Sequence, residues 1–156
     1  MLTGVYSHAQ KESTHWYFGR KAGVQFTNSG PVALTNSAMI TGKGCASISH
    51  RCSGDLLFYT DGDTIWNRNH VAMTNGTGLL GNVESTQSAI IVENPDTTTN
   101  QYYIFTVGAG SSGGLNYSVV DMNLSGGLGA VMTTLKNVPL VNPTLEKVTG
   151  VKHGNN

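Results

Sequence analysis

Residues 44–69 have the sequence GCASISHRCSGDLLFYTDGDTIWNRN, and this stretch decides the fold class. Its apolar residues form three short runs that are separated by a polar turn and by an Asp-Gly turn. That pattern is typical of a β-meander, in which consecutive strands pair antiparallel. The central run, LLFYT at 56–60, is apolar throughout and predicts a strand buried on both faces. A short fourth strand is expected near 71–73.

A second stretch, residues 88–121, repeats this plan. It contains the runs SAIIVENP, QYYIFTV and LNYSVVD, again separated by turns that are rich in polar residues and glycine. A fourth, outer strand is expected over 131–138, and the first strand of a further meander over 148–153. Repeated meanders of this length predict the blades of a β-propeller.

The composition supports an all-β fold and excludes some partners. The 156-residue chain has 20 glycines and only 12% charged residues, with a formal net charge of zero. Such a chain lacks the basic surface of a nucleic-acid-binding protein. It contains no apolar run of about 18 residues, so no membrane span is expected.

The N-terminal part is less regular. Residues 1–13 are interpreted as the remainder of a secretory signal peptide or as a disordered N-terminus. The segment 15–26, HWYFGRKAGVQF, predicts two short strands or one bent strand, and 32–43 an outer strand or a loop.

The expected fold is therefore an all-β fragment of a β-propeller over residues 14–156. It has two four-stranded antiparallel blades, near 44–73 and 88–138, and the start of a third blade near 148. A propeller needs at least four blades to close. The chain is thus expected to be part of a longer protein whose remaining blades complete the ring, and the alternative is a small open sandwich.

Several segments together resemble a known family. They are HWYFGRKAGVQF, residues 44–73, NGTGLLG, STQSAIIVENP, YYIFTV, LNYSVVDMNLSGGLGAV and EKVTGVKH. They resemble the N-terminal region of the large surface proteins of Bacteroidetes-type bacteria that are described as gliding-motility-associated or type IX-secreted. The resemblance implies a WD40/YVTN-like β-propeller, a secreted, cell-surface location, and a role in binding or adhesion.

The richest polar cluster lies around the Asp-Gly turn. Asp61, Asp63, Asn67 and Asn69 offer oxygen atoms, the ligands that calcium prefers. The spacing does not fit an EF-hand, because Trp66 and Ala72 occupy the positions of its glycine and glutamate. The alternative is that these side chains stabilise the turn by accepting hydrogen bonds from backbone amides.

The two cysteines are predicted to be free thiols. Seven residues of extended chain would place Cys45 and Cys52 roughly 20 Å apart, beyond the reach of a disulfide. Cys45 is expected to be buried and Cys52 to lie in a turn. The small residue usual at position 52 in the resembling family speaks against a role for a thiol pair.

No catalytic set stands out. The five histidines are scattered, and neither a G-x-S-x-G elbow nor a P-loop lysine is present. We therefore expect a non-enzymatic binding or structural module without a cofactor, calcium excepted, whose partner is a protein or a glycan at the cell surface. The alternative is the N-terminal part of a propeller-fold hydrolase, such as a glycosidase, with most active residues on other blades.

Overall fold

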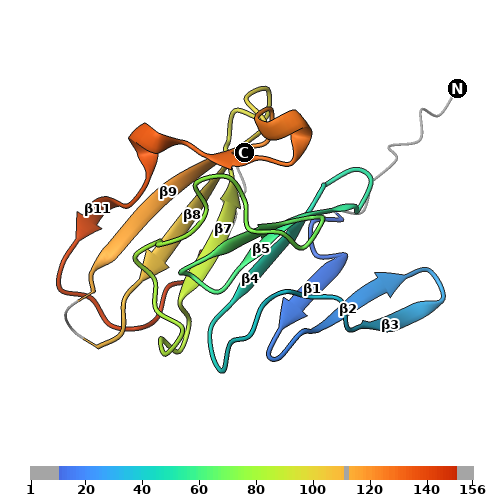
Figure 1. Ribbon diagram of the computed structural model, residues 1–156, viewed down its shortest axis with the longest axis horizontal. Coiled ribbons are helices and arrows are strands. Elements are labelled where there is room, and N and C mark those ends of the chain that lie inside the picture. The colour runs from blue at the N-terminus through green and yellow to red at the C-terminus, as the bar shows by residue number, and fades with distance from the viewer. Residues whose placement is uncertain (1–10, 111–112, 151–156) are drawn as a thin grey trace, which may run out of the picture.

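The protein is all-β, and its strands form three separate antiparallel sheets (Figure 1). The structure is a computed structural model that describes residues 11–110 and 113–150. None of the three sheets closes on itself. Strands that follow one another in the chain pair within each sheet, as the two meanders of the sequence predict, except that the last strand of the third sheet skips the strand before it. Two 3₁₀ turns, η1 (Ser125–Gly127) and η2 (Thr133–Leu135), interrupt the C-terminal part.

The first sheet was only partly anticipated. It consists of β1 (His15–Phe18), β2 (Ala22–Thr27) and β3 (Gly30–Leu34), in that order. The two strands expected over 15–26 are confirmed, and the residues expected as an outer strand or a loop supply most of β3. This sheet forms a third unit beside the two predicted ones, and the sequence did not reveal it as a unit.

The middle sheet matches the stretch that decided the fold class. It consists of β4 (Ala46–Ser49), β5 (Leu56–Thr60) and β6 (Ile65–Asn67). The predicted fourth strand near 71–73 is reduced to a single bridge between Trp66 and Ala72, so this sheet has three strands and not four. The turn over 67–70, with His70 in a left-handed backbone conformation (φ 60°), brings the chain back beside β6. Backbone hydrogen bonds from Asn67 to Val71 and from Met73 to Ile65 flank this one bridge.

The third sheet has five strands where four were expected. It contains β7 (Ala89–Glu93), β8 (Gln101–Val107), β9 (Leu115–Asp121), β10 (Ala130–Val131) and β11 (Val138–Val141). The prediction of one outer strand over 131–138 was wrong. The η2 turn breaks that segment, and β10 and β11 pair separately with β9.

The middle sheet is buried on both faces. A β-bulge places Leu57 and Phe58 on the side of the third sheet, while Leu56 and Tyr59 face the first sheet. One core, with Phe58, Tyr102 and Ile104 among its members, lies between the middle and third sheets. A second core of Tyr17, Met39, Leu56 and Tyr59 lies between the first and middle sheets. The predicted burial of the 56–60 strand is thereby confirmed.

Two predictions fall at the limits of the described chain. Residues 1–10 lie outside the described part, so the interpretation of 1–13 as a signal-peptide remainder or a disordered terminus stays open. Residues 148–150 form no strand, and 151–153 lie outside the described part, so the third predicted blade also stays a prediction.

Candidate functional site

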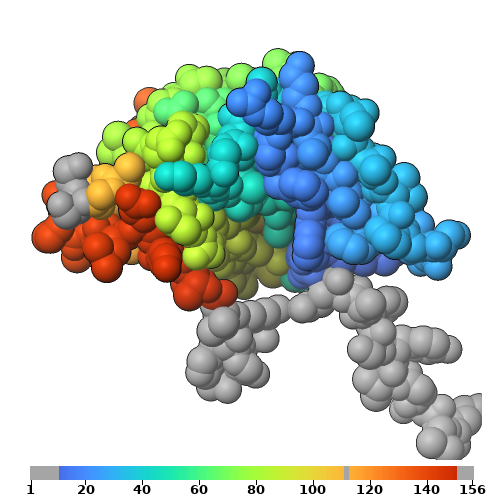
Figure 2. All heavy atoms as spheres, turned by 90° about the horizontal axis from the view of Figure 1, so that it is seen from below, coloured from blue at the N-terminus to red at the C-terminus, as the bar shows by residue number. Residues whose placement is uncertain are grey.

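The first strands of the three sheets lie next to one another. β4 contacts β1 on one side and β7 on the other. Seen from below in Figure 2, the blue, cyan and yellow-green segments that contain these strands meet on one face of the molecule. All three sheets contribute side chains to this face.

Serine side chains join these first strands. Ser47 Oγ accepts a hydrogen bond from the backbone N–H of Tyr17 at 3.0 Å, and Ser49 Oγ accepts one from the N–H of His15 at 3.3 Å. These amides lie at the edge of β1, where backbone groups need partners outside their own sheet. Small hydroxyl side chains on β4 therefore let two sheets meet without a continuous backbone ladder.

A third serine makes the corresponding link to the third sheet. The buried Ser88 Oγ lies 2.8 Å from the carbonyl oxygen of Gly44 and 2.6 Å from that of Asp61. Gly44 has no side chain to keep the strands apart, and a Cβ at this position would collide with the backbone of Gln87 and Ser88. The close approach of β4 and β7 thus depends on Gly44 and Ser88 together.

A shallow hollow of about 410 Å³ crosses the three first strands, and we call it the first-strand hollow. This volume falls within the range of small-ligand sites. None of its described lining residues is charged; they are Trp16, Tyr17, Phe18, Cys45, Ala46, Ser47, Gln87, Ala89, Ile90 and Ile91. Its polar groups are hydroxyl, thiol and amide, which suit an uncharged ligand.

Two aromatic side chains stand at the edge of this hollow. Trp16 is 51% exposed and Phe18 41%, although both belong to β1. Trp16 meets Phe26 edge to face, with ring centroids 5.0 Å apart, so its orientation is fixed while much of its surface stays free. Exposed, oriented aromatic rings of this kind are typical of binding surfaces.

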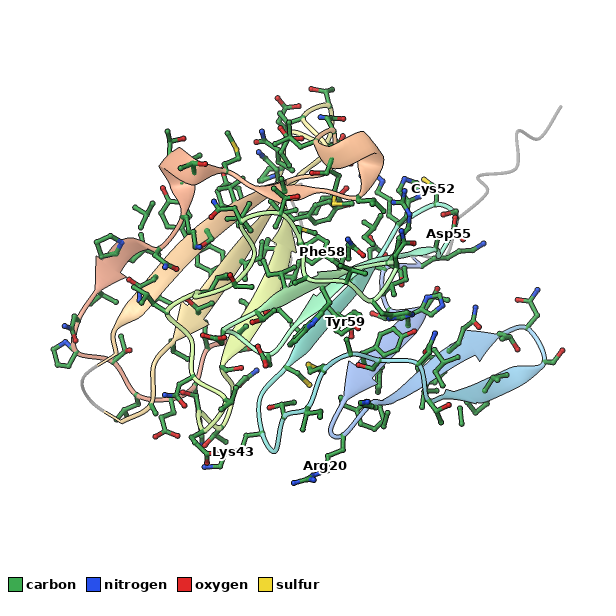
Figure 3. The ribbon with its side chains drawn as sticks, in the orientation of Figure 1. Arg20, Lys43, Cys52, Asp55, Phe58 and Tyr59 are labelled. Carbon is green, nitrogen blue, oxygen red and sulfur yellow. The ribbon has the colours of Figure 1, made fainter. Side chains whose placement is uncertain are left out.

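A second hollow, of about 540 Å³, lies at the far end of the middle sheet and has charged side chains in its lining. It is lined by His50, Ser53, Asp55, Leu56, Leu57 and Arg68, and Figure 3 labels Asp55 beside the exposed Cys52 at this end. His50 Nδ1 accepts hydrogen bonds from the backbone N–H groups of Cys52 and Ser53, at 3.4 and 3.2 Å. In the neutral ring Nε2 therefore carries the proton.

The predicted calcium ligands occupy two separate turns. Asp61 and Asp63 precede β6, whereas Asn67 ends it and Asn69 follows it. Asp61 Oδ1 accepts the N–H groups of Asp63 and Thr64 at 3.0 and 2.9 Å. Burial raises the pKa of the Asp61 carboxyl, and these two hydrogen bonds oppose the rise.

The asparagine turn is built in the same way. Asn67 Oδ1 accepts the N–H of Asn69 at 2.9 Å and that of Val71 at 3.4 Å. The turn-stabilising alternative therefore accounts for Asp61 and Asn67. Within residues 11–110 and 113–150, no three His, Cys, Asp or Glu side chains are placed to hold a metal ion. Calcium at Asp61, Asp63, Asn67 and Asn69 stays a prediction.

A polar-aromatic joint between the first two sheets was not predicted. The Tyr59 ring stacks on Tyr17 at a centroid distance of 4.7 Å, and its hydroxyl lies 3.1 Å from His70 Nδ1. The other ring nitrogen of His70 lies 2.9 Å from Asn36 Nδ2. Burial lowers the pKa of His70. The residues come from four distant positions without a shared motif, so no sequence signal could have grouped them.

The prediction that the two cysteines are free thiols is confirmed. Both Cys45 and Cys52 are free, Cys52 in an exposed turn and Cys45 half-buried in the first-strand hollow. Burial raises the pKa of the Cys45 thiol, with the nearby Asp61 adding to the rise. The Cys45 side chain is therefore suited to packing more than to thiolate chemistry.

Comparison of the chain with protein-family models, with curated proteins and with solved structures found no match. The resemblance to the gliding-motility-associated surface proteins accordingly stays a prediction. Among the described residues, no helix has the length and apolar character needed to cross a membrane.

Proposed function

We propose that this chain is a non-enzymatic binding module formed by consecutive blades of a secreted β-propeller. The observation that carries the proposal is the arrangement of β1, β4 and β7. Each is the first strand of an antiparallel meander, and each lies beside the first strand of the neighbouring sheet. Blades of a propeller are related in this way around a central channel.

The chain after β11 continues the same arrangement. The N–H of Gln87, just before β7, donates to the carbonyl oxygen of Glu146 at 3.0 Å, much as the N–H of Gly44, before β4, donates to Ser85 at 3.2 Å. A Cβ on Gly150 would lie 3.1 Å from Ile90 Cδ1 on β7. Residues 146–150 thus lie where the first strand of another blade would begin, which supports the predicted start near 148.

The first-strand hollow is the binding site in this proposal. In a propeller it would face the channel, and its exposed Trp16 and Phe18 would contact the ligand. The uncharged lining favours a neutral glycan or an uncharged stretch of protein at a cell surface. Aromatic rings pack on the apolar faces of such ligands, while Ser47 and Gln87 can hydrogen-bond their hydroxyl or amide groups.

The tryptophans allow a direct test. Trp16 and Trp66 are the two tryptophans of the chain, and Trp66 stacks on Tyr59 away from the hollow. We would titrate the protein with neutral hexasaccharides, namely cellohexaose, xylohexaose and chitohexaose, and follow its intrinsic fluorescence. The proposal expects a saturable change in fluorescence that is absent in Trp16→Phe. It also expects that calorimetry detects binding to the unchanged chain and none to Trp16→Ala.

Leu145→Ala serves as the matched control, because Leu145 is 78% exposed and does not line the hollow. Binding that is equally tight in Trp16→Ala and in the unchanged chain would refute the hollow as the site.

A propeller-fold hydrolase is the second candidate, and the charged lining of the second hollow is the observation that favours it. His50 and Asp55 lie together there with Arg68. Hydrolysis of chromogenic glycosides that is lost in Asp55→Asn would establish this alternative in place of the binding module.

A further inference from the structure

The described lining of the second hollow comes from one end of the middle sheet. Because β4, β5 and β6 run antiparallel, β4 and β6 end where β5 begins. The hollow of about 540 Å³ at this end combines two opposite charges, two polar groups and an apolar pair, namely Asp55, Arg68, His50, Ser53, Leu56 and Leu57. Such a volume can hold a small ligand. Both neighbours of the middle sheet belong to the described chain, so this hollow is not the uncovered face of an end sheet.

The two charges in this hollow are without a charged partner in the described chain. Within residues 11–110 and 113–150, neither Asp55 nor Arg68 takes part in an ion pair, with each other or with another side chain. Arg51, in the same turn as Asp55, pairs with Glu93 at 3.8 Å. Burial lowers the pKa of the nearby His15, and the charge of Asp55 does not reverse this. The His15 ring is therefore neutral at neutral pH and leaves the Asp55 carboxylate uncompensated.

Local contacts hold both charged residues in place. The backbone of Asp55 closes the turn after β4, because its N–H donates to Ser53 Oγ at 3.2 Å and its carbonyl oxygen accepts the N–H of His50 at 2.8 Å. The guanidinium of Arg68 donates from Nη1 to the carbonyl oxygen of Gly127 in the η1 turn, and its other N–H groups remain as donors. A site whose groups are already ordered loses little entropy when a ligand binds.

The remaining groups of the hollow suit a ligand that has an apolar body. Leu56 and Leu57 supply apolar atoms to the lining. Since Nδ1 of His50 accepts two backbone N–H groups, its Nε2–H is a further donor. The hollow thus offers a carboxylate for a cationic group, a guanidinium and an imidazole N–H for an anionic group, and apolar contact for the rest of the ligand.

We propose that the second hollow binds a small zwitterion with an apolar body, namely an apolar amino acid or a short apolar peptide. The ammonium group of the ligand contacts the Asp55 carboxylate, and the carboxylate of the ligand contacts the Arg68 guanidinium. A ligand with one charge would leave the other charge of the hollow unmatched, so the pair selects for zwitterions. Because both protein charges face solvent, each contact is weak, and we expect binding in the micromolar to millimolar range.

This site is separate from the one assigned under the proposed function. The described linings of the two hollows have no residue in common. The ligand of the first-strand hollow is uncharged, whereas a zwitterion carries both charges. Trp16→Ala should therefore bind the zwitterion like the unchanged chain, and either ligand assignment can fail without the other.

Calorimetric titration of the full 156-residue chain tests the inference. The probes are leucine, dileucine and trileucine, which share both charges and an apolar body but differ in the separation of the charges. We expect saturable binding of at least one of them, and the length that binds best distinguishes an amino acid from a peptide. N-acetylation removes the ammonium charge and amidation removes the carboxylate, and each should weaken binding about ten-fold.

Two variants assign these charges to residues. Asp55→Asn should bind the unmodified and the N-acetylated probe equally well, and Arg68→Gln should bind the unmodified and the amidated probe equally well. Arg20→Gln is the matched control, because Arg20 is exposed, does not line the hollow and lies away from Asp55 in Figure 3. It should keep both preferences. Far-UV circular dichroism verifies that each variant is folded.

Two results on the unchanged chain would overturn the proposal, whatever the folding of the variants. One is the absence of binding for all three probes up to their solubility limits. The other is modified probes that bind as tightly as the unmodified ones. Binding with both preferences retained in Asp55→Asn and in Arg68→Gln would also overturn it, because the ligand would then lie outside the second hollow.

Discussion

Phe58 and Tyr59 are neighbours on β5 but belong to different cores. The Phe58 ring meets Tyr102 of the third sheet edge to face at a centroid distance of 5.5 Å, whereas the Tyr59 ring stacks on Tyr17 of the first sheet at 4.7 Å. Figure 3 labels the two side chains at the centre of the molecule. Because successive strand residues point to opposite faces, this one pair couples all three sheets.

Truncating the core between the middle and third sheets should be costly. Phe58 and Ile104 are both 0% exposed, so Phe58→Ala or Ile104→Ala should lower the free energy of unfolding by about 2–5 kcal/mol. Urea denaturation followed by circular dichroism measures the loss. Leu80→Ala, at a 49% exposed position, should change stability by less than about 0.5 kcal/mol. A similarly small loss at Phe58 would contradict the strand register.

The hydroxyl of Tyr59 should contribute separately from its ring. It accepts the N–H of Ala38 at 2.9 Å and lies 3.1 Å from His70 Nδ1. Tyr59→Phe leaves both groups without this partner and should cost about 1–3 kcal/mol. Tyr103→Phe, at a half-buried position of β8, is the matched control and should be nearly neutral. Equal decreases in melting temperature for the two substitutions would contradict the stabilising role of the Tyr59 hydroxyl.

Gly44 should be irreplaceable where the middle and third sheets meet. A Cβ at Gly44 collides with the backbone of Gln87 and Ser88, so Gly44→Ala should destabilise the fold by about 1–3 kcal/mol through overpacking. Gly42 lies two residues earlier and has no atom within 4 Å of its Cβ position. Gly42→Ala should therefore be tolerated. Unfolding of the two alanine variants at the same denaturant concentration would contradict the close approach of β4 and β7 at Gly44.

The C-terminal segment should detach at acid pH. Hydrogen bonds from the backbone N–H groups of Gly110 and Thr86 lower the pKa of the Glu146 carboxyl in the folded protein. Because the pKa is lowered in the folded protein, ionised Glu146 stabilises the attached segment fully at pH values above its ordinary pKa of 4.5. This stabilisation is lost as the pH falls through the folded-state pKa.

Limited proteolysis with pepsin measures this detachment in acid, and hydrogen exchange measures it at neutral pH. Residues 142–150 should become accessible only in acid, while Glu146→Gln should make them accessible at neutral pH as well. A segment that responds to pH identically in the variant and in the unchanged chain would exclude Glu146 as the anchor.

The sequence predicted the middle and third sheets because their strands have long apolar runs between clear turns. Strand β3, GPVAL, escaped recognition as part of a unit because glycine and proline lower strand propensity. Leu79 and Leu80 are adjacent apolar residues of one loop, yet Leu79 is 3% exposed and Leu80 49%. Neighbouring residues in a loop have no fixed periodicity, so the pattern alone could not separate them.

The first-strand hollow could not be predicted in the same way. Trp16, Ser47 and Gln87 are brought together by the packing of separate sheets, and no local pattern encodes that packing. The Asp61 and Asn67 turns, by contrast, follow from local sequence, because Asp and Asn accept the backbone N–H groups two residues ahead.

The central claim is the side-by-side order of the three sheets, and a NOESY spectrum of the labelled protein tests it most directly. The account predicts cross-peaks between the rings of Tyr17 and Tyr59 and also between those of Phe58 and Tyr102, whose centroids are 4.7 and 5.5 Å apart. Absence of either set in a folded sample would contradict the account, because it would separate an end sheet from the middle one.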